Sequence, residues 1–394
     1  MLNEVTLNKN AIIFWADSYQ MGLTYHFSRL IPYLRVACSG SADFFVISHK
    51  SEQNPGLWDY VLEKTPASSC YKYSNWDTPE CLKDIENDIV SSHEKVLFHV
   101  QGPKQVRKLI PLKKKFGSRI KIVVWVHSFR NGNGNLQRII TSAIVGRLYR
   151  KWVDKVIFLS PFAWKNFIGG SRMIREGKAH FLPLSVESFS DFSCPTADNL
   201  PLSFLNTLES TDVFKIIYLA NFLPNKGHGW LLEGCIPVLR QHPNMRVFFL
   251  GDGPFRVTIE KQAAEAGIKD QVLTPGRISR TFIPWILQHC HVAITGTGSE
   301  NAGHNAIEPY LAGIPVIGTR VGSAEYLLQD FNIGIGVGHH NSLQLSQMLE
   351  MAFHDPQMCY EMGKKGKLIC ETLFTHEAVC GSLAKMYSVL LSYE

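Results

Sequence analysis

The stretch TGSENAGHNAIEPYLAGIPVIG, residues 297–318, decides the fold class of the second half of the chain. An apolar strand (residues 291–295) precedes it, and small residues open it. Gly313 ends a predicted helix of two to three turns, and the next apolar strand follows at once. Glu300 lies in the strand-to-helix loop and Glu308 lies inside the helix. Because eight residues span a little over two turns, both carboxylates are expected on one side of that helix.

The first turn of this predicted helix is also a site for an anion. The backbone amides around Gly303, His304 and Asn305 have no partner within the helix, and they point outward from its start. Carboxylates bind hydroxyl groups and helix amides bind phosphate. The spacing therefore predicts a clamp for a ligand that carries both, such as a nucleotide linked to a sugar.

Four motifs in chain order carry a family resemblance. The Glu300/Glu308 pair resembles the Glu-x7-Glu signature of the retaining glycosyltransferases of family 4, which have two Rossmann-like domains (the GT-B fold). The other three motifs are IYLANFLPNKG (217–227), FLGDGP (249–254) and GTRVGSAEYL (318–327). The resemblance is specific over roughly residues 214–330 and diffuse over the rest of the chain.

The resemblance implies roles for residues of the second half. Glu308 would accept hydrogen bonds from the nucleotide ribose, and Glu300 would contact the hydroxyls of the donor sugar. Lys226 would stabilise the diphosphate as the glycosidic bond breaks. The family usually has Gly-Arg where this chain has Ala220-Asn221. Asn221 can donate a hydrogen bond there but supplies no charge, so one cation is missing from the predicted diphosphate site.

Three further positions match the family less specifically. Gly22 follows the first strand in a loop that would approach the diphosphate, although an ordinary turn also explains a single glycine. His127 ends an apolar strand at the edge where doubly wound sheets bind ligands, and would reach the donor sugar; a capped strand end is the other explanation. Ile278, in Gly276-Arg277-Ile278, lies in a loop whose backbone would contact the base.

Length and composition indicate a folded two-domain α/β protein. A chain of 394 residues exceeds what one core usually holds. We predict an N-terminal Rossmann-like acceptor domain (1–195), a Rossmann-like nucleotide-sugar domain (205–375), a cleft between them, and a last helix (376–394) that returns to the first domain. The polar stretch 185–212 is the expected linker.

Short Val- and Ile-rich strands alternate with helical segments in the first half, which is typical of a doubly wound parallel sheet. The strands are expected at 11–16, 43–48, 95–100, 120–127 and 155–160, and the helices at 104–116 and 136–152. Residues 52–92 show no firm period.

The chemistry of the side chains favours a cytoplasmic setting. Nine cysteines are scattered without a Cys-x-x-Cys pair, no apolar run is long enough to span a bilayer, and the first apolar stretch does not resemble a signal peptide. His289-Cys290-His291 suggests a metal site at first sight, but a packed strand start explains it better. We expect no metal cofactor.

Basic residues are concentrated in the first half of the chain. Residues 1–200 carry 26 Lys and Arg against 17 Asp and Glu, whereas residues 201–394 carry 14 against 17. Between 104 and 178 there are 18 basic residues and only two acidic ones. An anionic membrane surface, approached by the helix at 136–152 and the lysines at 113–115, or a phosphate-bearing acceptor would explain this field. The apolar stripe of that helix is expected to lie in the core.

Taken with the resemblance, these features predict an enzyme that moves a sugar from a UDP- or GDP-sugar to an acceptor hydroxyl with retention of configuration. The acceptor would be a glycan or lipid-linked saccharide in cell-surface polysaccharide synthesis, and the enzyme would bind peripherally at the inner face of the membrane. A sugar-nucleotide epimerase of related fold is the first alternative. A basic nucleic-acid-binding module is the second, but no nucleic-acid motif accompanies the charge, and nucleic acid is not an expected partner.

Overall fold

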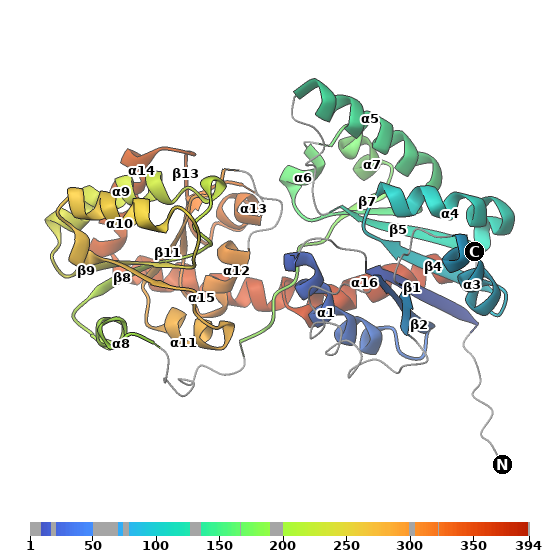
Figure 1. Ribbon diagram of the computed structural model, residues 1–394, viewed down its shortest axis with the longest axis horizontal. Coiled ribbons are helices and arrows are strands. Elements are labelled where there is room, and N and C mark those ends of the chain that lie inside the picture. Colours follow the sequence, from blue (N-terminus) through green and yellow to red (C-terminus); the bar gives the residue numbers. More distant parts are fainter. Residues whose placement is uncertain are drawn as a thin grey trace, which may run out of the picture. The chain divides into compact units, whose positions relative to one another are not determined.

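The computed structural model describes residues 9–16, 21–49, 70–73, 79–126, 135–165, 167–189, 200–298, 304–321 and 323–392. These residues form two compact units. Unit 1 consists of Met1–Glu187 together with His376–Glu394, and unit 2 consists of Ser188–Thr375. Each unit is built on its own parallel sheet covered by helices (Figure 1). No helix among the described residues is long and apolar enough to cross a membrane.

Unit 1 contains a seven-stranded sheet in the order β3-β2-β1-β4-β5-β6-β7, and all adjacent strands pair in parallel. The strands are β1 (Asn10–Ala16), β2 (Asp43–His49), β3 (Cys70–Tyr73), β4 (Lys95–Val100), β5 (Ile120–Val126), β6 (Lys155–Phe158) and β7 (Ala179–Phe181). The helices are α1 (Met21–Ala37), α3 (Pro79–Ile85), η2 (Glu86–Val90), α4 (Pro103–Phe116), η3 (Gly117–Arg119), α5 (Asn135–Trp152), α6 (Pro161–Lys165), α7 (Gly170–Arg175) and α16 (His376–Leu391).

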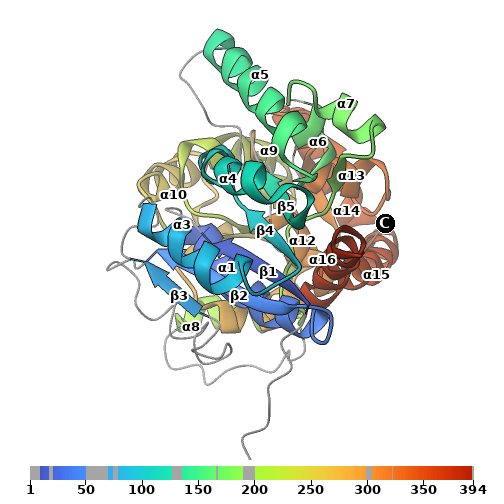
Figure 2. The same cartoon turned by 90° about the vertical axis from the view of Figure 1, so that its right-hand side faces the viewer.

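Alternate side chains of β1 pack on opposite faces of the sheet, as expected for a sheet covered on both faces. Ile13 and Trp15 of β1 belong to the core cluster that also contains the buried side chains of α4 and α5. Figures 1 and 2 show α4 and α5 next to one another beside β4 and β5. On the other face, Phe14 contacts His99, which is hydrogen-bonded to Tyr387 of α16. Helix α16 also packs against α1, so it is part of the core of unit 1.

Unit 2 contains a six-stranded parallel sheet in the order β10-β9-β8-β11-β12-β13. The strands are β8 (Phe214–Leu219), β9 (Met245–Leu250), β10 (Val272–Gly276), β11 (Val292–Thr295), β12 (Val316–Thr319) and β13 (Ile335–Val337). The helices are α8 (Leu202–Glu209), η4 (Pro224–Lys226), α9 (His228–Gln241), α10 (Arg256–Glu265), η5 (Lys269–Gln271), η6 (Arg280–Phe282), α11 (Ile283–Gln288), α12 (His304–Leu311), α13 (Ser323–Gln329), α14 (Ser342–His354) and α15 (Pro356–Leu373).

The predicted fold class, two Rossmann-like α/β domains, is therefore confirmed, and three local predictions need correction. The expected linker at 185–212 contains helix α8, which buries Phe204 and Leu208 because Phe204 packs on Phe248 of the sheet. Gly22 lies in the first turn of α1 and not in a loop, since the helix begins at Met21.

The stripe of the helix at 136–152 is not entirely core. Ile140 and Ile144 are each 51% exposed, whereas Val145 and Tyr149 of the same helix are buried in the core of unit 1. Leu148 of the predicted stripe does pack against this core, so the prediction holds for only part of the stripe.

Candidate functional site in unit 2

The strand order of unit 2 reverses direction between β8 and β11, because β9 and β10 lie on one side of β8 and β11 to β13 on the other. Parallel doubly wound sheets bind ligands at this switch point, outside the carboxyl ends of the strands. The loop that follows β8 contains Asn221 and Lys226, and the loop that follows β11 leads through Thr297 to the predicted clamp. The topology thus brings the two principal sequence motifs to one edge of the sheet.

The Lys226 loop is held close to the end of β11. Gly227 has a φ of 75°, and a methyl group added to it would lie 2.3 Å from the Gly296 carbonyl oxygen. Only glycine fits this left-handed, crowded position. The indole of Trp230 donates to the same carbonyl at 3.1 Å. Helix α9 starts directly after Gly227, so the half-exposed Lys226 lies beside a helix N-terminus, where backbone amides and the helix dipole favour an anion.

Two hydroxyl groups fix the start of the loop after β11 from both neighbouring strands. The buried Tyr218 hydroxyl of β8 donates to the Lys226 carbonyl at 2.7 Å and lies 3.5 Å from the Thr297 hydroxyl. On the other side, the Thr319 hydroxyl of β12 donates to the Thr297 carbonyl at 2.8 Å. The entry to the 297–303 segment and the lysine loop are thereby tied into one hydrogen-bonded unit.

The Gly-Asp-Gly-Pro turn supports the backbone on which Asn221 stands. Methyl groups added at Gly251 and Gly253 would lie 2.1 Å from the Ala220 carbonyl oxygen and 2.6 Å from the Phe222 carbonyl oxygen. The turn consequently packs directly against residues 220–222, and Phe222 N donates to Asp252 O at 3.0 Å. Asn221 is exposed at the end of β8, where its amide can donate a hydrogen bond.

Glu308 is buried inside α12, as the sequence predicts for a helix residue of the clamp. Its Oε1 forms a short ion pair with the guanidinium of Arg280, whose side chain is 57% exposed. A buried carboxylate needs such a partner to offset the loss of hydration. Arg280 begins the turn after β10, two residues beyond the half-buried Ile278, so the predicted ribose-binding residue and the predicted base-binding loop lie against one another.

The first residue of α9 is an uncharged histidine. His228 is buried and stacks on Phe222 with ring centroids 4.2 Å apart. Burial lowers its pKa to about 4. His228 is therefore neutral at neutral pH and adds no positive charge beside Lys226, the basic residue of this loop.

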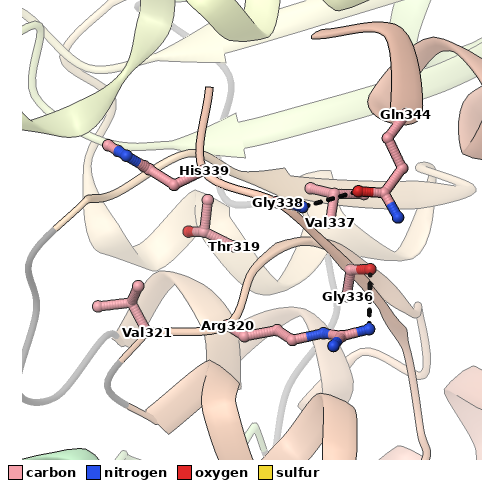
Figure 3. A pocket seen from close by; sticks show the side chains of 8 residues that line it. All are labelled: Thr319, Arg320, Val321, Gly336, Val337, Gly338, His339 and Gln344. Carbon is pink, nitrogen blue, oxygen red and sulfur yellow. Dashed lines mark hydrogen bonds between the residues drawn. The ribbon is translucent and has the colours of Figure 1, made fainter. Parts of the chain in front are cut away.

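A cavity of about 350 Å³ lies at the carboxyl ends of β12 and β13. Figure 3 shows the Arg320 side chain beside Gly336 and the Gln344 side chain beside Gly338. The lining residues are Thr319, Arg320, Val321, Gly336, Val337, Gly338, His339 and Gln344. Thr319, which holds the Thr297 carbonyl, also lines this cavity, so the cavity adjoins the start of the clamp loop.

The remaining predicted residues divide into two groups. His304 and Asn305 are the first two residues of α12, so their amides belong to the first helical turn as predicted. Both residues are partly buried. Glu300, Gly303 and His127 lie outside the described residues.

Part of the chain is similar to a known protein family. The model of the family "Glycosyl transferases group 1" matches residues 204–368. This match covers 165 of the 394 residues of the chain. The matched segment contains Lys226, Arg280 and Glu308 and is almost all of unit 2.

Curated relatives are similar mainly over part of the chain. The EpsD protein of Bacillus subtilis (strain 168), whose name describes a glycosyltransferase, is 24% identical over 183 residues, 46% of this chain and 47% of that one. The 2-deoxystreptamine N-acetyl-D-glucosaminyltransferase of Niallia circulans is 26% identical over 107 residues, 27% of this chain and 28% of that one. The chain therefore matches less than half the length of these relatives.

Solved structures are similar over the whole chain. The glycosyltransferase of Rickettsia africae ESF-5 superposes with a TM-score of 0.74 at 15% identity, covering 98% of this chain and 100% of that one. Anabaena Alr3699/HepE in complex with UDP gives a TM-score of 0.73 at 16% identity, with 96% and 100% covered. At such identities the likeness shows the GT-B fold.

Sequence reasoning missed the residues that position the site. Tyr218 and Thr319 look like ordinary strand residues, and Arg280 lies 28 residues from the glutamate it contacts. One signal was present for Tyr218, because a buried tyrosine hydroxyl requires a hydrogen-bond partner.

Proposed function

We propose that this chain transfers a sugar from a nucleotide-sugar donor to an acceptor hydroxyl with retention at the anomeric carbon. The observation that carries the proposal is the junction of the Lys226 loop with Thr297 through the Tyr218 hydroxyl at the switch point of unit 2. This junction supports the proposal because it ties the Lys226 loop, which leads into α9, to the loop that leads to Glu300 and Glu308.

In the proposed mechanism each group of the site acts on one part of the donor. Lys226 and the amides at the start of α9 hold the diphosphate and stabilise the charge that develops on it. When the donor binds, the ribose hydroxyls compete with Arg280 for Glu308 and donate hydrogen bonds to its carboxylate. Glu300 orients the sugar. The bond between the anomeric carbon and the diphosphate oxygen breaks, and the bond to the acceptor oxygen forms on the same face. The departing diphosphate takes the acceptor's proton, so no protein nucleophile and no metal enters these steps.

The donor is proposed to be a UDP- or GDP-sugar. Two observations on other proteins support these bases: Anabaena Alr3699/HepE has been solved in complex with UDP-glucose, and a Mycolicibacterium smegmatis relative is named a GDP-mannose-dependent mannosyltransferase. In this chain the base would meet the backbone near Ile278, which follows the left-handed Gly276. Because these contacts use backbone atoms, the shape of this loop would determine which base is bound.

The acceptor is proposed to be a glycan or lipid-linked saccharide that the enzyme meets at an anionic membrane surface on the cytoplasmic side. Helix α5 supports this part of the proposal. Ile140, Ile144, Arg147 and Lys151 follow one another at helical spacing, and all four are exposed. Two apolar and two basic side chains on one face suit the headgroup region of an anionic bilayer.

The lysines of the neighbouring helix contribute less than the sequence suggests. Lys113 is paired with Asp154 at 2.7 Å, and Lys115 is paired with Glu86. Lys114 lies 5.8 Å and Lys151 lies 5.1 Å from the centre of the Trp152 ring. Binding to vesicles that contain phosphatidylglycerol should fall on substitution of Ile144 and Lys151 by glutamate. Unchanged binding of that double variant would refute the membrane part alone.

The experiment that tests the central proposal is a thermal-shift screen with UDP-, GDP- and ADP-sugars, followed by product analysis with and without candidate acceptors. One class of nucleotide sugar should raise the melting temperature, and a new glycoside should appear only when acceptor is present. An epimerised donor formed without acceptor would instead establish the epimerase alternative. No stabilisation by any nucleotide sugar would refute the donor site.

A further inference from the structure

Three side chains with metal-binding atoms converge on unit 2 away from the proposed donor site. His242 follows the end of α9, while Glu350 and His354 lie one turn apart near the end of α14. The Nε2 atom of His242 is 2.9 Å from Glu350 Oε1 and 3.0 Å from its Oε2, and the Nε2 atom of His354 is 3.0 Å from Oε1. Within the described part of the chain, this is the one group of three such residues whose ligand atoms all lie within 4.8 Å of one another.

The elements that carry these residues are rigidly packed. Helices α9 and α14 approach closely at Gly234, where an added methyl group would lie 2.7 Å from a Leu345 side-chain carbon. The Gln271 amide donates to the carbonyls of Leu239, His242 and Met245, and so fixes the chain at the end of α9. Ligands that stand on fixed elements need little reorganisation to bind an ion.

Ring packing fixes the orientation of the His242 imidazole. Its centroid is 4.1 Å from that of Phe353, and Phe353 in turn packs against Phe214 of β8 with centroids 5.4 Å apart. The imidazole therefore rests on an aromatic pair that belongs to the core of the unit. Its Nε2 atom is directed at the carboxylate, and its side chain is only 13% exposed.

The carboxylate of Glu350 lies between the two imidazoles. Its Oε1 is within hydrogen-bond distance of both Nε2 atoms. Gln241 also donates toward Glu350 Oε1 at 3.4 Å, which orients the same oxygen from outside the group.

The ligand set and the distances fit zinc better than calcium or magnesium. Two imidazoles and one carboxylate are a common zinc set, whereas the hard cations prefer oxygen ligands alone. Zinc binds such atoms at about 2.0–2.2 Å, so neighbouring ligands of a tetrahedral ion lie about 3.3 Å apart. The present separations of 2.9 and 3.0 Å need to open by only a few tenths of an ångström.

We propose that His242, Glu350 and His354 form a binding site for a zinc-class divalent ion that joins the end of α9 to α14. The site has a structural role. His242 precedes β9, and so lies toward the amino end of the strands, whereas Lys226 and Thr297 lie at the carboxyl ends. The reaction proposed above does not use this ion, and the inference does not rest on the proposed function.

Calorimetric titration of the untagged, chelator-treated chain with ZnCl₂ tests the proposal. One ion per chain should bind, the melting temperature should rise with zinc, and Co²⁺ should give the visible absorption of a tetrahedral complex. His354→Ala and Glu350→Gln should each weaken zinc binding at least about tenfold, because each removes a ligand from a set of three. The imidazole of His354 is 64% exposed, so His354→Ala should fold normally without metal.

Two matched variants serve as controls. Glu361→Gln changes an exposed glutamate of α15, and His289→Ala removes a histidine of the His289-Cys290-His291 run. Both should bind zinc like the unmodified chain. Absence of stoichiometric binding, or equal binding by His354→Ala and Glu350→Gln, would overturn the proposal. Removal of zinc should leave UDP-sugar binding unchanged. The zinc titration and the UDP-sugar titration therefore test the two proposals independently.

Discussion

The hydroxyl of Tyr218 donates to the backbone carbonyl of Lys226 at 2.7 Å from a side chain that is buried in the core of unit 2. The bond joins the loop after β8 to the strand that positions it, and the same hydroxyl reaches toward Thr297 in the loop after β11. A cation that is meant to stabilise a developing charge must already be in place when the bond breaks. We therefore propose Tyr218 as a positioning residue for Lys226.

Tyr218→Phe should lower turnover several-fold with the fold retained. The substitution keeps the buried ring and removes only the hydroxyl, which leaves the Lys226 carbonyl without that donor at a cost of about 1–3 kcal/mol. Steady-state turnover and thermal unfolding should be measured together. Tyr387→Phe is the matched control, because it also removes a buried, hydrogen-bonded hydroxyl, from the helix α16 of unit 1. If both variants lose turnover equally, the effect of Tyr218 is one of stability alone.

Thr319→Val should lower the turnover number more than it lowers the affinity for UDP. The hydroxyl of Thr319 holds the Thr297 carbonyl at 2.8 Å, so its loss should loosen the segment that leads to Glu300, whereas the Lys226 loop keeps its own bonds. UDP affinity by calorimetry and turnover with saturating donor separate the two effects. Thr207→Val removes a comparable, solvent-exposed hydroxyl-to-carbonyl bond within α8 and should change neither. Equal losses in affinity and turnover would contradict the assignment.

Patterns that repeat along the chain were predictable, because they depend on local backbone preferences and on burial of one face. The strand at 95–100 and the helix that ends before the left-handed Gly313 are examples. Contacts between side chains that are far apart in sequence were not predictable. The Arg280–Glu308 pair depends on how the turn after β10 meets α12, and the exposure of Ile144 depends on the rotation of α5.

Glu308→Gln should weaken UDP binding at least about tenfold, since it removes a charge-assisted partner of the ribose hydroxyls. Arg280→Ala should weaken UDP binding less than Glu308→Gln does, because the guanidinium is 57% exposed and the ribose hydroxyls replace it as partners of the buried carboxylate once UDP is bound. Calorimetry with UDP measures both. Glu361→Gln, a glutamate on the exposed face of α15, is the control for the loss of charge. A larger effect of Arg280→Ala than of Glu308→Gln would transfer the ribose role to the arginine.

Unit 2 should lose stability as the pH falls from about 6.5 to about 4, in part through His291. Burial lowers the pKa of His291 to about 4, so the unfolded chain binds a proton in this window that the folded chain excludes. By the acid end of this pH range, this pKa shift should have lowered the free energy of unfolding by about 3 kcal/mol. The neutral ring accepts a hydrogen bond from Lys215 N through Nδ1 at 3.0 Å. His291→Asn can keep this bond without titrating.

The measurement is urea unfolding of both proteins at pH 7 and pH 4.5. The difference in unfolding free energy between the two pH values should be smaller for His291→Asn than for the unmodified chain. An identical pH dependence would show that His291 is protonated in the folded protein at an ordinary pH.

Lys226→Ala should raise the free energy of the transition state by about 2–4 kcal/mol, the scale associated with loss of one preorganised charge stabiliser. The family's arginine position is occupied here by Asn221, and His228 is neutral, so no other charge of this loop replaces the ammonium group. The backbone carbonyl that Tyr218 holds is unchanged in this variant, and the loop should therefore keep its shape. Lys261→Ala, on the exposed face of α10, is the control.

Asn221→Arg should partly restore the activity of Lys226→Ala, because Asn221 is exposed on the same loop and a guanidinium binds phosphate oxygens bidentately. Two cations that share one diphosphate should not act additively, so Asn221→Arg should have a smaller effect in the unmodified chain than in Lys226→Ala. The measurement is a double-mutant cycle on turnover at fixed ionic strength. Additive effects would mean that the two positions act on different parts of the donor, and normal turnover of Lys226→Ala would mean that the diphosphate binds elsewhere.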